Sequence, residues 1–251
     1  MRFCVPVPCF FGKGDFCEAI KTVSSLGFDA VETYNWKSID VAAARRTAEE
    51  CGVEIMSMCT TEFRMTSPEH RELWLDGLRE SCDAAVRLGV KRLITQVGQD
   101  TGAPRELQHA AIVDTLKLAR PILEEHGVTV MIEPLNTLVD HKGYYLHSAY
   151  EAFDIISEVD HPNVKVVYDI YHQQIMEGNI IPTVTANLDK IAHLHCAAHP
   201  GRCEPWLGES NYDFIFAAIE KAGYRGACGL EYWAKNMPPL ESLAECKRRY
   251  K

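Results

Sequence analysis

The sequence lacks the features that mark membrane proteins, nucleic-acid-binding proteins and disulfide-stapled domains. No apolar run approaches the roughly 20 residues that a membrane-spanning helix needs. The net charge is -9 and no basic stripe is visible, whereas phosphate binding requires clustered positive charge. Ten cysteines are present, but they are scattered without CxxC spacing. We therefore expect neither a membrane nor a nucleic acid as partner.

The N-terminus also lacks a secretory signal, because residues 1–5 lead directly into a strand-like run. With the scattered cysteines, this predicts reduced thiols and a cytoplasmic protein. Linker-like and low-complexity segments are missing too, so residues 1–251 are expected to form a single domain. A length of 251 residues is near the upper size of one core and is typical of a (β/α)8 barrel.

Strand-like and helical stretches alternate along the whole chain. The strand-like runs cover residues 3–7, 30–33, 53–58, 92–96, 128–132, 164–169, 191–195 and 226–231. The helical stretches lie near residues 15–26, 38–52, 67–89, 105–126, 147–158, 171–178, 182–188, 211–222 and 240–249. Consecutive apolar positions favour strands buried on both faces, as in a parallel sheet. Repeated β-then-α alternation implies right-handed crossovers. The eight units predict a single (β/α)8 TIM barrel.

Four of these runs end in a polar side chain, namely Glu133, Asp169, His195 and Glu231. A carboxylate at the end of a buried strand is costly unless it is paired. The C-terminal ends of all barrel strands open on one face, so these side chains should converge there. Each alone could merely bond a neighbouring loop. Together, three carboxylates and one imidazole suit Mg²⁺, Mn²⁺ or Co²⁺ better than a thiolate-rich zinc site would.

Two more histidines lie near these strand ends. His172 follows Asp169 by three residues and could line the mouth of the barrel and donate to a substrate oxygen; the alternative is a surface histidine on a short helix. His193 precedes His195 by two residues, so both lie on one face of a strand, with His193 deeper in the barrel. We expect a hydrogen-bonded core role for His193. Further candidates for shaping the pocket are Trp36, Cys59, Phe63, Gln96, Asn136 and Cys196, although a buried cysteine is usually a small hydrophobic residue.

The order and spacing of several motifs resemble the xylose-isomerase-like barrels. The motifs are Glu133-Pro-Leu-Asn136, Tyr168-Asp-Ile-Tyr-His172, His195 followed by Pro200-Gly-Arg202 and Glu204-Pro205, and Gly229-Leu-Glu231. Within that family the chain looks most like the hydroxypyruvate isomerase and ketose 3-epimerase (D-tagatose 3-epimerase-like) branch. The resemblance also implies a homo-oligomer, since such proteins are often dimers or tetramers.

The resemblance implies one divalent metal ion held by Glu133, Asp169, His195 and Glu231. It implies that the two glutamates act as a general acid/base pair across an enediol intermediate, and that His172 and Arg202 contact substrate oxygens. The chemistry is consistent, because a cation chelated by adjacent carbonyl and hydroxyl oxygens stabilises an enediolate. Two carboxylates on opposite sides can then remove and return a proton, and an arginine can fork two hydrogen bonds.

The predicted activity is that of a metal-dependent sugar or hydroxy-keto-acid isomerase, similar to hydroxypyruvate isomerase. The alternative is a ketose 3-epimerase that uses the same residues on a free ketose. His195 stands where hydroxypyruvate isomerases often carry glutamine, and Glu204-Pro-Trp-Leu-Gly208 replaces their Gly-Thr-Gly loop. These departures leave the small-molecule substrate open.

Two other function classes fit the residues less well. A related apurinic-site endonuclease would use three zinc ions and would need further histidines at earlier strand ends. The chain instead has Met58-Cys59-Thr60 and Gln96 there, and it is acidic. A non-catalytic sugar-binding barrel is the other alternative, and the retention of both Glu133 and Glu231 argues against it.

Overall fold

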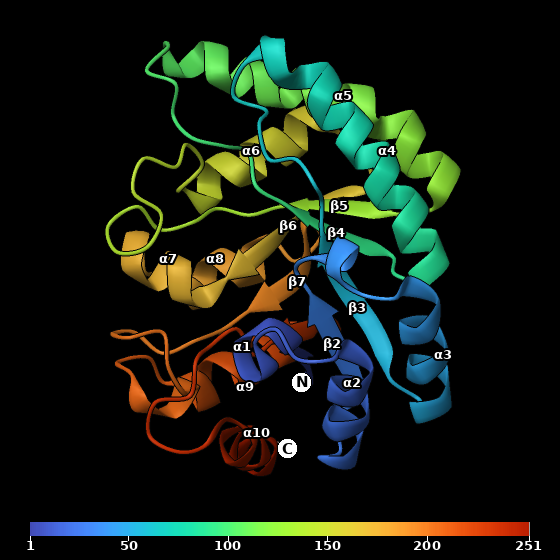
Figure 1. Cartoon of the computed structure of the whole chain (residues 1–251). Helices are drawn as coiled ribbons and strands as arrows, with labels where there is room; N and C mark the ends of the chain where they lie inside the picture. Colours follow the sequence, from blue (N-terminus) through green and yellow to red (C-terminus); the bar gives the residue numbers. More distant parts are fainter. Residues whose placement is uncertain (251) are drawn as a thin grey trace.

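The computed structural model describes residues 1–250, and within that range eight parallel strands close into a barrel (Figure 1). The strands are β1 (Arg2–Pro6), β2 (Ala30–Thr33), β3 (Glu54–Cys59), β4 (Arg92–Thr95), β5 (Thr129–Ile132), β6 (Val164–Asp169), β7 (Ile191–His195) and β8 (Ala227–Gly229). Each strand pairs with the next in sequence, and β1 pairs with β8 to complete the ring. The predicted TIM barrel is confirmed.

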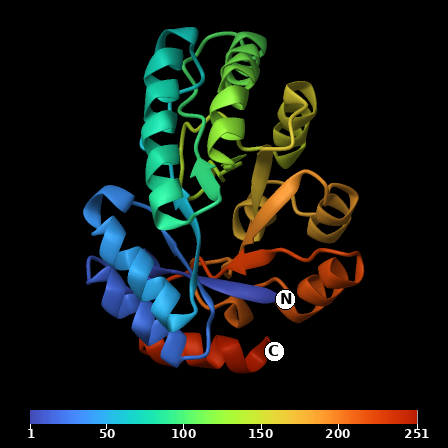
Figure 2. The ribbon, with the colours of Figure 1, turned by 90° about the vertical axis from the view of Figure 1, so that its right-hand side faces the viewer.

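Helices follow the strands and cover the outside of the barrel. The α-helices are α1 (Val7–Phe11), α2 (Phe16–Ser25), α3 (Val41–Cys51), α4 (Arg71–Leu88), α5 (Arg105–His126), α6 (Ala149–Val159), α7 (Ile170–Met176), α8 (Ile180–Ala186), α9 (Tyr212–Lys221) and α10 (Pro239–Arg249). Short 3-10 turns are η1 (Trp36–Ser38), η2 (Pro68–His70) and η3 (Pro205–Leu207). The long helices α4 and α5 lie side by side in both views (Figures 1 and 2).

The helix boundaries follow from caps that the sequence contains. Asp15 accepts a hydrogen bond from the backbone of Glu18 at 2.9 Å and so begins α2. Gly52 closes α3 in the left-handed conformation, with φ at 65°. The single helix expected over residues 67–89 is divided, because Ser67 caps a 3-10 turn and α4 begins only at Arg71. The short helix α1 was not predicted.

The barrel interior is polar at its centre, whereas a large apolar cluster fills the space between strands and helices. Inside the barrel, Glu32, Ser57 and His193 are fully buried. A shift in strand register places Val31 beside Ile55 but Glu32 beside Ser57, so a bulge in β3 aligns the last two side chains. The loops that follow β5 and β7 gather on the left of the barrel in Figure 1. In residues 1–250, none of the helices is both long enough and apolar enough to cross a bilayer.

Candidate active site

The four side chains predicted as metal ligands lie together at the C-terminal mouth of the barrel. Asp169 and His195 are the last residues of β6 and β7, while Glu133 and Glu231 follow β5 and β8 by one and two residues. Glu133, His195 and Glu231 line a cavity of about 290 Å³, and Asp169 lies beside two other lining residues, His172 and Arg202. The cavity lining comprises Tyr34, Cys59, Phe63, Ile94, Gln96, Glu133, Leu135, His141, His172, His195, Arg202 and Glu231.

The potential ligand atoms are close enough to share one ion. Oxygen or nitrogen atoms of Glu133, Asp169, His172 and Glu231 all lie within 4.8 Å of one another. His195 adjoins this group, with Nδ1 at 3.2 Å from Oε2 of Glu231 and 3.8 Å from Oε1 of Glu133. The structure thus brings together the four predicted ligands and adds His172 as a fifth neighbour.

The hydrogen bonds of His172 decide what this imidazole can do. Its Nδ1 accepts from the backbone N–H of Asn136 at 3.2 Å and lies 2.6 Å from Nδ2 of the same residue. An accepting Nδ1 carries the lone pair, so the proton of the neutral ring is on Nε2. That Nε2 lies 3.4 Å from Oδ2 of Asp169. His172 therefore presents an N–H donor to the site, as expected for a substrate contact, and not a metal-binding lone pair.

His195 presents the opposite nitrogen. Its Nδ1 is buried, points toward Glu133 and Glu231, and has no hydrogen-bond partner. Its Nε2 lies 3.0 Å from Oε2 of Glu32 in the barrel interior. Burial would lower the pKa of His195, but the charges of Glu32 and Glu231 raise it well above its usual value. A proton on Nδ1 beside two carboxylates is therefore the one that a cation would displace, which is the chemistry of a metal-binding histidine.

Arg202 is the cation of the site. Its Nη2 donates to Oε2 of Glu231 at 2.7 Å and lies 3.8 Å from Oδ2 of Asp169. The guanidinium carbon lies 5.1 Å from the ring centroid of Tyr171 and 5.2 Å from that of Trp233, so two aromatic rings hold it in place. Arg202 is thus where the sequence predicted it, and it is also paired to a proposed catalytic glutamate.

Tyr34 is a site residue that the sequence reasoning missed. Its hydroxyl donates to Oε1 of Glu231 at 2.6 Å. Together with Arg202, it fixes both oxygens of that carboxylate. Tyr34 follows β2 directly, so the strand-end rule that found Glu133 and Asp169 could have found it.

Burial and crowding perturb the acidic groups. Burial, reinforced by the charge of Glu231, raises the pKa of Glu133 to about 8 and that of Asp169 to about 7. Burial would raise the pKa of Glu231 as well, but the neighbouring charges of Arg202 and His195 lower it below its usual value. Burial is the main cause that lowers the pKa of His172 well below its usual value, and the positive charge of Arg202 adds to it. The ring of His172 is therefore neutral.

These features fit a divalent cation. One oxygen of Asp169 and Nδ1 of His195 are buried without a hydrogen-bond partner, and such atoms are costly unless something binds them. The raised pKa values of Glu133 and Asp169 show that the site has too little positive charge to hold all three carboxylates ionised. Oxygen-rich sites with one imidazole suit Mg²⁺, Mn²⁺ or Co²⁺. The donor set present therefore matches the cofactor that the sequence predicted.

The other residues that were expected to shape the pocket lie partly at the cavity and partly in the core. Cys59, Phe63 and Gln96 line the cavity, and Asn136 lies behind His172. Trp36 is buried in the apolar cluster and, among residues 1–250, does not line the cavity. His193 is hydrogen-bonded in the core, as predicted.

The motif around residue 204 serves to position a loop. The buried carboxylate of Glu204 accepts from the backbone N–H groups of Lys235 and Asn236 at 3.1–3.2 Å. Trp206 lies against the guanidinium of Arg249 in α10. Within the described chain, neither Trp206 nor Leu207 lines the cavity.

The sequence matches one protein family and several isomerases over most of its length. The model of the xylose isomerase-like TIM barrel family matches residues 20–249. The hydroxypyruvate isomerase of Escherichia coli (strain K12) is 32% identical over 241 residues, which cover 92% of this chain and 93% of that protein. The 2-oxo-tetronate isomerase of Haemophilus influenzae is 32% identical over 248 residues, which cover 92% of this chain and 93% of that protein.

Solved structures share the fold. A crystal structure described as AP endonuclease, family 2 from Brucella melitensis matches with a TM-score of 0.91 and 27% identity, covering 100% of this chain and 99% of the other. The D-psicose 3-epimerase of Clostridium cellulolyticum H10 matches with a TM-score of 0.81, covering 98% of this chain and 89% of the other. Its identity of 21% supports only the likeness of fold.

The matches cover nearly the whole chain, and the related sequences are isomerases. The protein is therefore an enzyme of the isomerase class, and the chain belongs to the xylose isomerase-like TIM barrel family.

Proposed function

We propose that this enzyme is a metal-dependent isomerase of a small hydroxy-keto acid or sugar, acting as hydroxypyruvate and 2-oxo-tetronate isomerases do. The observation that carries the proposal is the convergence of Glu133, Asp169, Glu231 and Nδ1 of His195 at the mouth of the barrel, beside one small cavity. The cavity of about 290 Å³ lies at the lower end of ligand-site volumes, which favours a small substrate.

The proposed cofactor is one divalent cation, Mg²⁺, Mn²⁺ or Co²⁺, held by Glu133, Asp169, His195 and Glu231. When bound, it would supply positive charge to two adjacent substrate oxygens and so make the neighbouring C–H group more acidic. Arg202 lies 2.7 Å from Glu231 and 3.8 Å from Asp169, so one guanidinium faces several buried carboxylates, which supports a requirement for a cation.

Glu133 and Glu231 are the proposed pair that moves the proton through an enediolate. One glutamate removes a proton from carbon, and the other returns a proton at the second position. Their surroundings already differ, because the pKa of Glu133 is raised to about 8 whereas Arg202 and His195 lower that of Glu231. Two carboxyl groups whose pKa values are pushed apart are typical of an acid and a base in one site.

His172 and Arg202 are the proposed substrate-binding residues. Asn136 holds His172 with its Nε2–H toward the cavity, where it can donate to a hydroxyl or carbonyl oxygen. Arg202 is held between two rings, so its guanidinium is ordered before a substrate arrives. Both donors would orient substrate oxygens relative to the glutamate pair.

A ketose 3-epimerase is the second candidate, because it uses the same glutamates and His195 matches its third ligand. An endonuclease with three zinc ions is disfavoured by the cavity lining. β3 ends in Cys59 and β4 is followed by Gln96, where further imidazole ligands would be needed. Both positions instead present groups suited to packing or to hydrogen bonding with a small substrate.

A substrate panel tests the proposal. The purified protein is treated with a chelator, dialysed, and assayed with hydroxypyruvate, 2-oxo-tetronates and free ketoses after separate addition of Mg²⁺, Mn²⁺ and Co²⁺. We expect activity to disappear on chelation and to return with at least one of these ions. Full activity in the presence of the chelator would contradict the metal mechanism.

Product analysis in deuterated water separates the two candidate reactions. An isomerase exchanges hydrogen at C1 or C2 of the substrate, whereas a 3-epimerase exchanges the hydrogen at C3. The position of deuterium, read by NMR, therefore assigns the reaction on whichever substrate is turned over.

A cytoplasmic location is also proposed. All ten cysteines are free thiols in the structure, which is typical of proteins from reducing compartments. A homo-oligomer stays a prediction, and size-exclusion chromatography with light scattering would measure it.

A further inference from the structure

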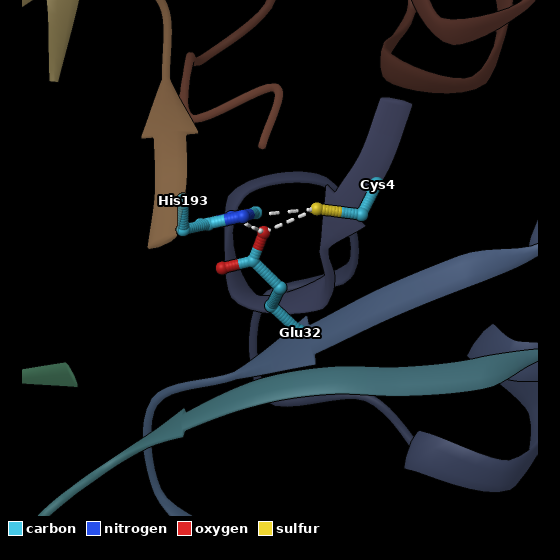
Figure 3. A group of neighbouring side chains, drawn as sticks. All are labelled: Cys4, Glu32 and His193. Carbon is cyan, nitrogen blue, oxygen red and sulfur yellow. Dashed lines mark hydrogen bonds and ion pairs between the residues drawn. The ribbon is translucent and has the colours of Figure 1, made fainter. Parts of the chain in front are cut away.

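Beneath the proposed metal site, one buried carboxylate joins four side chains from across the barrel. Glu32 on β2 is fully buried. Its Oε1 contacts Sγ of Cys4 and lies 3.0 Å from Nε2 of His193. Its Oε2 accepts from Oγ of Ser57 at 2.8 Å and lies 3.0 Å from Nε2 of His195. Figure 3 shows Cys4, Glu32 and His193 pointing toward one another from β1, β2 and β7.

The spacing identifies this group as a hydrogen-bond cluster and not as a second metal site. Sγ of Cys4 lies 3.7 Å from Nε2 of His193, but Oε1 of Glu32 is at hydrogen-bond distance from both atoms. Tetrahedral ligands held about 2.0–2.3 Å from an ion are about 3.3–3.7 Å apart. Oε1 of Glu32 is thus too close to both atoms to share an ion with them, and each of the four neighbours can donate to the carboxylate.

This arrangement selects the tautomer of His195. An ionised carboxylate can only accept hydrogen bonds, so the ring nitrogen facing Glu32 carries a proton. A histidine that binds a metal ion is neutral, so in the loaded site a ring with its proton on Nε2 would have its lone pair on Nδ1. In His195, Nδ1 lies at the mouth of the barrel, 3.2 Å from Glu231 and without a hydrogen-bond partner. The carboxylate therefore leaves free the nitrogen that faces the metal ligands.

We propose that Glu32 is a positioning residue for the metal site. It accepts from Nε2–H of His195, holds the orientation of the ring and keeps Nδ1 available as the ligand atom. This inference rests on the proposed function, because it requires His195 to bind the cation. Glu32 does not line the cavity and acts only through His195. Carboxylates that accept from ligand histidines typically change metal affinity 10–100-fold when they are removed.

The cluster offers its own control in His193. This residue contacts the same carboxylate through the other oxygen, but it lies deeper and does not line the cavity. The variants Glu32→Gln and His193→Gln both disturb the same buried cluster. Glu32→Gln removes the charge that orients His195, whereas His193→Gln keeps an N–H donor near the position of the lost Nε2. A purely structural role of Glu32 predicts similar effects on metal binding in both variants.

The experiment measures the Mn²⁺ dissociation constant by electron paramagnetic resonance of free Mn²⁺. The wild type, Glu32→Gln and His193→Gln are compared, and far-UV circular dichroism confirms the fold of each. We expect binding to weaken by about tenfold or more in Glu32→Gln and to stay within about threefold of the wild type in His193→Gln. Unchanged affinity in Glu32→Gln, or an equal loss in both variants, would overturn the inference.

A measurement on the wild type covers the case in which Glu32→Gln does not fold. In Mg²⁺-loaded protein labelled with ¹⁵N-histidine, NMR is expected to show His195 with its proton on Nε2 and none on Nδ1. A proton on Nδ1 in the loaded protein would overturn the inference. If the wild type binds neither Mn²⁺ nor Mg²⁺, the proposed function fails as well; if it binds them and Glu32→Gln binds equally tightly, only the role of Glu32 fails.

Discussion

Two groups of buried ionisable side chains lie at different depths of the same barrel, and their charges are balanced differently. In the interior, the carboxylate of Glu32 accepts hydrogen bonds from a thiol, a hydroxyl and two imidazoles, so both of its oxygens have partners. At the mouth, Arg202 is the guanidinium among three carboxylates, and one oxygen of Asp169 is buried without a hydrogen bond. The completed cluster orients residues, whereas the incomplete one has room for an external cation.

Exposure to solvent does not explain this difference. Glu32 is 0% exposed and Glu133 only 6%, yet their pKa values shift in opposite directions. Burial of Glu32 is outweighed by the charges and hydrogen bonds of His193 and His195, which lower its pKa well below the usual value. Burial of Glu133 is reinforced by Glu231, which raises its pKa to about 8. The partners, and not the depth, decide which carboxylate is stable in its charged form.

The largest expected effect is on turnover, in the group at the mouth. Glu133→Gln and Glu231→Gln each remove a carboxylate proposed to transfer the proton and to hold the cation. We expect kcat to fall by about 10²–10⁴-fold, the usual contribution of general acid/base catalysis. Initial rates on the active substrate, measured with saturating metal, check this prediction.

The matched control is Glu151→Gln, which removes a carboxylate paired with Arg105 between α6 and α5. It should leave kcat within about twofold of the wild type, because Glu151 does not line the cavity. Turnover at the wild-type rate in both Glu133→Gln and Glu231→Gln would show that the catalytic roles are wrong.

The next effect is on stability, and its sign should differ between the two groups. A carboxylate with a lowered folded pKa, such as Glu32, stabilises the fold above its unfolded pKa and loses that contribution as pH falls through the folded value. Glu32→Gln breaks a buried ion pair and should lower the free energy of unfolding by about 3–5 kcal/mol at neutral pH.

Glu133 should behave in the opposite way in the presence of a chelator. With its pKa raised to about 8, its ionisation costs stability, and that cost appears as pH rises from the unfolded pKa through about 8. Glu133→Gln should therefore raise the free energy of unfolding at pH 8.5, by up to about 5 kcal/mol. Urea unfolding followed by circular dichroism tests both variants, and a shift of the same sign in both would break the comparison.

A smaller effect concerns metal binding and pH. Glu133 and Asp169, with pKa values near 8 and 7, are protonated in the chain alone at lower pH, and a cation must displace those protons. The apparent affinity for Mn²⁺ should fall as pH decreases from about 8 to 6, by up to about tenfold per pH unit for each carboxylate. Calorimetric titrations in buffers of different ionisation enthalpy would report the released protons. An affinity independent of pH over this range would contradict the pKa shifts.

The same comparison shows what could be predicted from the sequence. Alternating strand and helix signals were enough for the barrel, because each β-then-α unit is a local pattern. Glu133, Asp169 and Glu231 were found because the C-terminal ends of parallel strands share one face. His193 was correctly expected in the core from its spacing to His195.

The interior cluster could not be found in this way. Glu32 lies within a short strand, and its imidazole partners are 161 and 163 residues away in sequence. A bulge between β2 and β3 sets which side chain faces Ser57, and no residue type in the sequence predicts such a shift in register. The proton position on His172 depends on Asn136, and that on His195 depends on Glu32. These contacts form only in the folded barrel, so the proton positions could not be predicted from the sequence.

The smallest predicted effect tests the donor role of His172. Asn136→Ala removes the side-chain amide 2.6 Å from Nδ1 but keeps the backbone N–H that also donates to it, so kcat/KM should fall by up to about tenfold, the value of one hydrogen bond. Asn136→Asp places a second oxygen near Nδ1, favours a proton there and removes the donor from Nε2. It should therefore lower kcat/KM more than Asn136→Ala does, although it is closer in shape to asparagine. If the aspartate variant were the more active of the two, the ring would not be acting as an Nε2–H donor, and the distinction between His172 and His195 would have to be reversed.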